Sequence, residues 1–130
     1  MASKKKVFIS FDFDHDALTK EALAAQAKLD DSPFDFYDAS IKSEQSGDWK
    51  EKARIRIRNA DIVIVLCGEH TASASGVSAE LELAREEKKS YFCLKAYPEK
   101  VCVLPKTAPS GEKLYRWTWD NLKSLIEGNR

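Results

Sequence analysis

The sequence predicts an α/β fold of the flavodoxin-like kind, with a five-stranded parallel sheet in the order 2-1-3-4-5 between two layers of helices. Short apolar runs of strand-forming residues alternate along the chain with segments of helical periodicity. The run 61–67 is apolar after its first residue, as in a central strand that is covered on both faces. Such alternation favours parallel strands joined by right-handed crossovers.

Composition bounds the function classes. The chain has 130 residues, which predicts one domain over 1–130, and 43% of them are apolar, enough for a packed core. Its 21 basic residues are balanced by 21 acidic ones, so we expect no nucleic-acid or membrane partner. No apolar run approaches the ~20 residues that span a bilayer. The three cysteines form no CxxC pair, and we expect reduced thiols, a cytoplasmic location and no metal centre.

A strand and a helix open the chain. Residues 7–11 predict the first strand, and acids crowd the loop that follows it. We expect Asp16 to cap the next helix, because an aspartate side chain accepts hydrogen bonds from the first free amides of a helix. The helix is predicted to extend to Leu29, with an apolar face at the spacing i, i+4, i+7 and i+11: Leu18, Ala22, Ala25 and Leu29.

A second strand and helix follow. Residues 34–37 predict the strand, and 39–47 a polar loop. Asp48 with Glu51 three residues later is typical of a helix start. Arg54, Arg56 and Arg58 form either a solvated helix face or a clamp for a diphosphate. The inward residues of this helix are predicted to be Trp49, Ala53, Ile57 and Ala60.

The second half supplies the remaining elements. Five segments follow in the order strand, loop, helix, strand and irregular connection: 61–67, 68–76, 77–89, 90–96 and 97–112. Residues 113–119 predict the fifth strand. Asp120 is expected to cap a last helix, whose inward residues are Leu122, Leu125 and Ile126.

This topology predicts where a ligand binds. In open parallel sheets, ligands bind outside the carboxyl ends of the strands, at the point where the strand order reverses. Here that point lies between the first and third strands, so the loops 12–16 and 68–76 should flank one crevice. The polar loop 39–47 should lie close by, and the helix over 77–89 should direct its N-terminus into the crevice.

Glu80 is the candidate functional residue on that helix. At about 100° per residue, Glu80 falls within the apolar arc of Val77, Leu81 and Ala84, whereas Glu82 falls on the opposite side with Glu86. A carboxylate on the packed face of a helix that opens onto a crevice indicates a functional acid. The alternative is a first-turn acid that complements the helix dipole, a contribution of ~0.3–1 kcal/mol.

Other chemistries lack their motifs. The chain has no GxGxxG, GxxxxGK[ST] or GxSxG sequence, which argues against a redox dinucleotide domain, a P-loop and a serine hydrolase elbow. Cys67 and Gly68 stand where a phospho-acceptor domain would need an aspartate. His15 and His70 are each either a base at the crevice or a surface histidine.

Several segments between residues 6 and 96 have a characteristic order and spacing: 6–11 with the acids behind it, 36–40, 49–50 ahead of Arg54, Arg56 and Ile57, 60–66, Thr71, and 77–81 with Ala84. Together they resemble bacterial TIR-like domains, of the kind found in the ThsB subunit of Thoeris antiphage systems. The resemblance implies cleavage of the nicotinamide–ribose bond of NAD and release of a cyclic or modified ADP-ribose signal that activates a partner effector. NAD is then a substrate, and no cofactor is expected.

The resemblance also implies a site. Glu80 matches the family glutamate at the start of the helix after the third strand. Family helices often carry a tryptophan three residues before it and an aromatic just before it, where Val77 and Ala79 stand here, so a ring of the substrate would rest on Phe11 or Phe13. Together with the crevice, the resemblance predicts substrate contacts from eight residues: Ser10, Phe11, Asp12, Phe13, Asp38, Ser40, Gly68 and Thr71.

Three functions stay open. The first is an NAD-cleaving enzyme that depends on Glu80. The second is a non-catalytic module that self-associates through TIR-type surfaces. The third is an enzyme that transfers the glycosyl group of a nucleoside and ignores NAD.

Overall fold

The computed structural model describes residues 5–12, 15–29, 32, 34–36 and 49–128, and it confirms the predicted sheet. All four strand pairs are parallel, in the order β2-β1-β3-β4-β5. The strands are β1 (Lys5–Ser10), β2 (Phe34–Phe36), β3 (Ile62–Cys67), β4 (Ser90–Lys95) and β5 (Leu114–Arg116). The helices are α1 (Ala17–Gln26), α2 (Trp49–Asn59), the 3-10 helix η1 (Thr71–Ser73), α3 (Ser75–Glu86) and α4 (Trp119–Ile126). Tyr37, the loop 39–47 and Asp48 lie outside the described residues.

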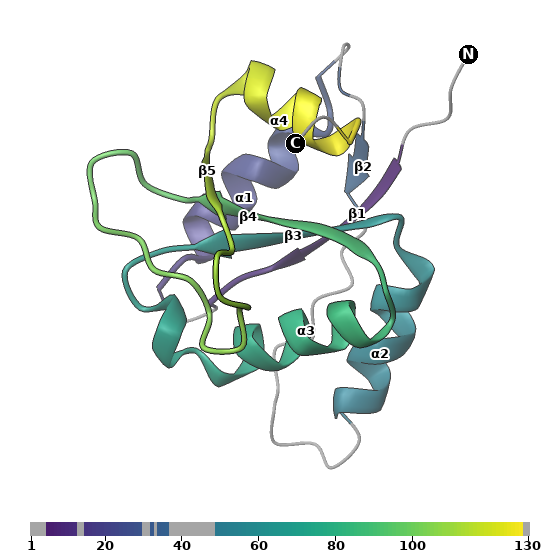
Figure 1. The fold of residues 1–130 in the computed structure, drawn as a ribbon. Helices are drawn as coiled ribbons and strands as arrows, with labels where there is room; N and C mark the ends of the chain where they lie inside the picture. The colour runs from purple at the N-terminus through teal and green to yellow at the C-terminus, as the bar shows by residue number, and fades with distance from the viewer. Residues whose placement is uncertain (1–4, 13–14, 30–31, 33, 37–48, 129–130) are drawn as a thin grey trace.

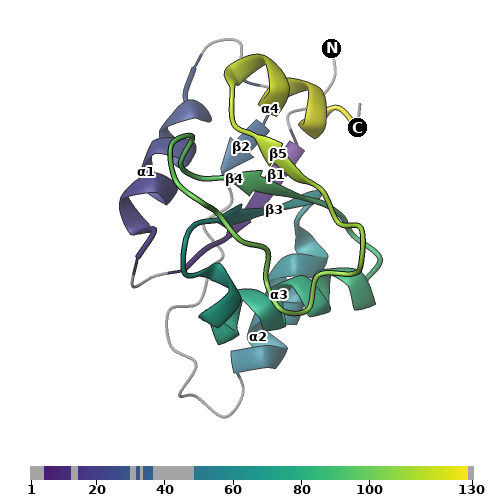
Figure 2. The same cartoon turned by 60° about the vertical axis from the view of Figure 1, so that its left-hand side comes forward.

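Helices cover both faces of the sheet (Figures 1 and 2). Helices α1 and α4 lie on one face, and α2 and α3 lie on the other. The central strand β3 is buried along its whole length, as its unbroken apolar run predicts. Its side chains alternate between the two cores: Ile62, Ile64 and Leu66 pack with α1 and α4, and Val63, Val65 and Cys67 pack with α2 and α3.

The apolar face predicted for α1 is wrong. Leu18 is 87% exposed, Leu29 is 47% exposed, and the two alanines between them also face solvent. The buried stripe begins with a lysine instead, and because lysine is charged, this stripe does not look apolar in the sequence. The Lys20 ammonium lies 5.6 Å from the centre of the Phe11 ring and 3.3 Å from a carboxylate oxygen of Glu21, whose side chain is exposed. The aliphatic stem of Lys20 is therefore buried while its charge meets an acid at the surface. The buried residues of this face are Lys20, Leu23, Ala24 and Ala27.

Helix α4 is capped by a different residue from the one predicted. The Thr118 hydroxyl oxygen accepts a hydrogen bond from the Asn121 amide at 3.1 Å, which makes Thr118 the N-cap. Asp120 lies inside the first turn, where its negative charge complements the helix dipole. The inward residues are those predicted: Leu122, Leu125 and Ile126.

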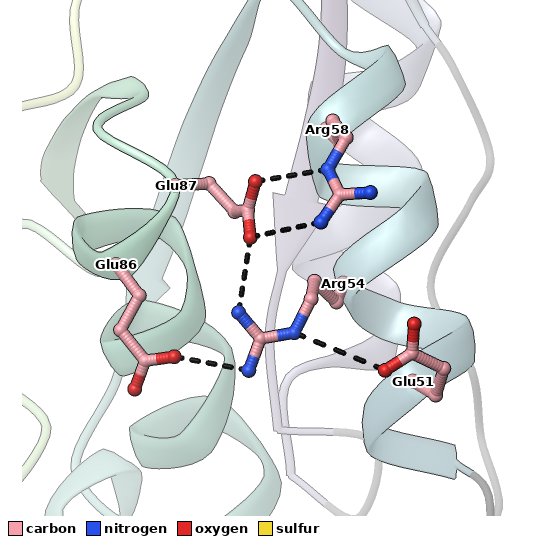
Figure 3. Close-up of polar contacts among 5 residues, drawn as sticks. All are labelled: Glu51, Arg54, Arg58, Glu86 and Glu87. Carbon is pink, nitrogen blue, oxygen red and sulfur yellow. Dashed lines mark hydrogen bonds and ion pairs between the residues drawn. The ribbon is translucent and has the colours of Figure 1, made fainter.

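An ion-pair network joins α2 to α3 (Figure 3). Arg54 contacts Glu86 and Glu87 at 3.0 Å each, and Arg58 Nε contacts Glu87 at 2.9 Å. Both glutamates stand at the end of α3, which leads to the amino end of β4. The network therefore lies near the amino ends of the strands, whereas the predicted crevice lies at their carboxyl ends. This position excludes Arg54 and Arg58 as a diphosphate clamp in the crevice.

We expect Glu87→Gln to reduce the acid sensitivity of the fold. Hydrogen bonds from Arg58 and Arg54 lower the pKa of Glu87 from an ordinary value of 4.5 to about 2. A carboxylate with a lowered pKa stabilises the folded state above its unfolded pKa, and this contribution is lost as the pH falls through the folded pKa. The variant should therefore lose less stability between pH 4.5 and 2 than the unaltered chain. Urea unfolding across this range measures the difference.

The matched control is Glu82→Gln, which removes an exposed carboxylate from the same helix. This variant should keep the pH slope of the unaltered chain. An equal slope in Glu87→Gln would show that the network contributes nothing to acid stability.

Candidate functional site

The loops that follow β1 and β3 meet at the end of the sheet where the strands have their carboxyl ends, as predicted. Gly68 follows β3 and packs so closely on Asp16 that a Cβ atom at Gly68 would lie 2.6 Å from Asp16 Oδ1. The rings of His15 and His70 stack with their centroids 3.9 Å apart. Both histidines are exposed, so their stacked rings join the two loops at the protein surface.

Ser10 and Glu80, 70 residues apart in the chain, form a buried hydrogen bond at this edge. Ser10 ends β1 and pairs in register with Val65, whose side chain packs toward α2 and α3. The Ser10 hydroxyl donates a hydrogen bond to Glu80 Oε1 at 2.6 Å. Ser10 is fully buried, and Glu80 is 5% exposed.

The position of Glu80 in α3 argues against the helix-dipole interpretation. Helix α3 begins at Ser75, earlier than the predicted start at residue 77, so Glu80 stands in the second turn. Dipole stabilisation falls off within the first turn, which contains no acid here. The predicted inward arc is confirmed, because Glu80 is buried together with Val77, Leu81 and Ala84. Its burial follows from the contact with β1.

Gly68 and Thr71, both predicted as substrate contacts, are held inside their own loop. Thr71 is fully buried, and its hydroxyl oxygen accepts a hydrogen bond from the Gly68 amide at 2.7 Å. The Gly68 carbonyl accepts another from the Val103 amide at 3.0 Å. These contacts fix the shape of the loop that carries the chain from β3 into α3.

The remaining predicted contacts separate into three groups. Asp12 Oδ2 lies 2.7 Å from His15 Nδ1, which places Asp12 at the crevice. Phe11 is 4% exposed and packs in the core under α1 and α4, so its ring does not provide the expected shelf beside Glu80. The third group lies outside the described residues: Phe13, Asp38 and Ser40.

Asp16 is a site residue whose role the sequence does not reveal. It holds the N-cap position of α1, but its side chain makes no capping hydrogen bond, contrary to expectation. Its Oδ1 accepts a hydrogen bond from the Tyr97 hydroxyl at 2.8 Å, and its buried Oδ2 has no partner among the described residues. Burial raises the pKa of Asp16 above its ordinary value. The acidic loop was the only local signal, because Tyr97 stands 81 residues away.

We expect Gly68→Ala to destabilise the fold by ~1–3 kcal/mol, the usual cost of overpacking. The added methyl group would meet both carboxylate oxygens of Asp16 at less than 3 Å. The double variant Gly68→Ala/Asp16→Ala removes that clash and should recover part of the loss. Urea unfolding of both single variants and the double variant measures the coupling. If the stability losses of the two single variants simply added up in the double variant, the contact with Asp16 would not be what restricts the side chain at position 68.

Cavities also open elsewhere on the molecule. One of about 520 Å³ lies along α1 and β2, and another of about 240 Å³ lies at the carboxyl ends of β4 and β5. Neither is lined by Ser10 or Glu80. The three cysteines are free thiols. Within the described ranges, no group of histidine, cysteine and acidic residues is placed to hold a metal ion, and no helix has the length and apolarity to cross a bilayer.

The fold and this edge define an α/β domain of the flavodoxin-like, TIR-like class, with a buried acid behind the third strand. Comparison with protein families then gives the particular family. The model described as "Thoeris protein ThsB, TIR-like domain" matches residues 8–100, and the chain belongs to this family. A comparison with curated proteins gave no match. The matched range includes Ser10, Asp16, Gly68 and Glu80.

Proposed function

We propose that this chain cleaves NAD at the bond between nicotinamide and ribose, with Glu80 as the catalytic residue. The observation that supports this most is the buried hydrogen bond between Ser10 and Glu80, at the carboxyl ends of the strands, where open parallel sheets bind ligands. Burying a carboxylate is costly, so an acid on the packed face of α3 calls for a purpose beyond packing. Membership of the ThsB TIR-like family supports the same chemistry.

The reaction requires one carboxylate. When the bond between ribose C1′ and the nicotinamide nitrogen breaks, its electron pair leaves with nicotinamide, which needs no proton. Positive charge develops on the ribose, and Glu80 stabilises it or forms an ester with C1′. Water, or an acceptor atom of the same ADP-ribose, then bonds to C1′ and gives a linear or cyclic product. The low exposure of Glu80 strengthens this stabilisation, because charge interactions are larger where water is excluded.

The other residues at this edge have supporting roles in the proposal. Ser10 fixes one carboxylate oxygen of Glu80 and so orients the acid. The loop around Gly68 and Thr71 sets the start of α3, and Asp12 lies beside it as a polar contact for the substrate. NAD is the substrate in this scheme, and no resident cofactor takes part. The released cyclic or modified ADP-ribose would act in the cytoplasm as the signal for a separate effector protein in antiphage defence.

Nicotinamide release tests the proposal. The purified chain is incubated with NAD over a range of protein concentrations, and the products are identified by mass. We expect nicotinamide together with a product of the ADP-ribose class. Unchanged NAD at every concentration would overturn the proposal. Consumption of a nucleoside without consumption of NAD would identify a glycosyl-transferring enzyme instead.

The exposed face of α1 favours a second candidate, the self-associating module. Leu18 in α1 is 87% exposed, and Leu29, which lies three residues beyond the end of this helix, is 47% exposed. Ala22 and Ala25 between them are exposed as well. Burying such side chains stabilises an interface. Sedimentation at increasing concentration should show an assembly that Leu18→Glu weakens. Assembly without any NAD turnover would favour this module over the enzyme.

A further inference from the structure

We infer that the cavity at the carboxyl ends of β4 and β5 binds the phosphate groups of a phosphorylated ligand. This inference goes beyond the proposed function, because it does not depend on NAD cleavage. The cavity has a volume of about 240 Å³. Its lining contains two cations and no acid: Lys95, Ala96, Pro98, Arg116, Trp117 and Thr118.

The two cations are placed side by side by the register of the sheet. Lys95 is the last residue of β4, Arg116 is the last residue of β5, and the two are paired across the strands. Like charges directly opposite one another destabilise a sheet. Neither side chain has an ion-pair partner among the described residues. An anion between them would remove this repulsion.

Several other cations of the molecule have acidic partners. Lys100 follows β4 in the chain, and its ammonium lies 3.5 Å from a Glu69 carboxylate oxygen and 4.6 Å from the centre of the Tyr97 ring. Arg54 and Arg58 are neutralised by Glu86 and Glu87. Lys95 and Arg116 differ from these cations because they are paired across two strands and line one cavity.

The rest of the cavity suits a phosphate group. Thr118, the N-cap of α4, lines the cavity beside the two cations, and its hydroxyl oxygen already accepts a hydrogen bond from the Asn121 amide. Asp120 stands in the first turn of the same helix, so the two cations are the groups that would bind the phosphate. The indole nitrogen of Trp117 donates to Gln26 Oε1 at 3.0 Å, which fixes the aromatic wall. Arginine binds phosphate through two parallel hydrogen bonds, and lysine binds it as a point charge.

The cavity is separate from the Ser10–Glu80 pair. Strands β3 and β4 lie between β1 and β5, which puts three strand spacings, about 14 Å, between the two places. Two kinds of ligand could supply the phosphate groups at this distance. The diphosphate of an extended dinucleotide could reach the cavity from Glu80, or a separate nucleotide could occupy it.

Calorimetric titration with inorganic pyrophosphate tests the inference on the full chain. We expect binding that weakens about tenfold or more in Lys95→Gln/Arg116→Gln, because two charge-assisted contacts are lost. The matched control is Lys106→Gln/Lys113→Gln, which removes the same charge from exposed positions outside the cavity and should leave the affinity unchanged. Equal affinity in the cavity variant and the unaltered chain would overturn the inference. An equal loss in both double variants would also overturn it, as it would reveal attraction by overall charge alone.

Competition in the Glu80→Gln background identifies the source of the phosphate. Displacement of pyrophosphate by NAD would assign the cavity to the substrate, and displacement by ADP but not NAD would assign it to a separate nucleotide. The two proposals fail separately. A chain that binds pyrophosphate through Lys95 and Arg116 without cleaving NAD would refute the proposed function alone.

Discussion

Glu80→Gln is expected to lower nicotinamide release from NAD by ~10³-fold or more, while the fold is retained. The substitution removes the negative charge that opposes the developing positive charge on the ribose, and loss of one preorganised electrostatic contact costs 10²–10³ in rate as an order of magnitude. It also removes the nucleophile of any ester intermediate. The amide is nearly isosteric, and its oxygen can still accept the hydrogen bond from Ser10. Initial rates by chromatography of nicotinamide measure the effect.

Glu82→Gln is the control for that experiment. Glu82 is exposed on the same helix, two residues from Glu80, so its substitution makes the same change of charge outside the crevice. Turnover should be unchanged in this variant. If Glu80→Gln kept most of the activity and gave the same product, Glu80 would have no part in the chemistry.

Ser10→Ala should lower kcat by ~10-fold or more with a much smaller change in KM. The Ser10 hydroxyl is a donor to the buried Glu80 carboxylate, and without it the acid loses an orienting contact. Removing a donor from a buried charged group should also cost about 1–3 kcal/mol of stability. Steady-state kinetics and urea unfolding of the same preparation separate the two effects.

Ser78→Ala provides the comparison for Ser10→Ala. Ser78 is also nearly buried on α3, but its hydroxyl oxygen accepts a hydrogen bond from the Lys106 amide and does not contact Glu80. This variant should lose stability without a matching loss of kcat. Equal kinetic losses in the two variants would reduce Ser10 to a structural role.

The parts predicted well from the sequence have a strong periodic signal. The unbroken apolar run that forms β3 identified a central parallel strand, and the alternation of strands and helices predicted a parallel sheet. The flavodoxin-like order expected for such a sheet is the one observed. The direction of Glu80 followed from the positions of Val77, Leu81 and Ala84 on one helical arc. In β3 and α3, the residues that produce the apolar pattern in the sequence are also the residues that pack in the core.

The sequence was misleading where tertiary contacts decide between similar local choices. Helix α1 is rich in alanine, and the stripe that includes Leu18 looked more apolar than the one headed by Lys20, which the core selects. Asp16 has the right type and position for an N-cap, but its carboxylate turns to Tyr97 and Gly68, which are distant in the chain. Such contacts leave no local pattern.

The central claim is that the Glu80 carboxylate lies beside the ribose that carries nicotinamide. A crystal structure of Glu80→Gln with NAD tests this most directly, because the variant should bind the substrate without consuming it. We predict that the side chain of residue 80 lies ~3–3.5 Å from the ribose, the separation of groups ready to react. A ribose bound elsewhere, with no atom of the substrate in contact with the side chain of residue 80, would contradict the account.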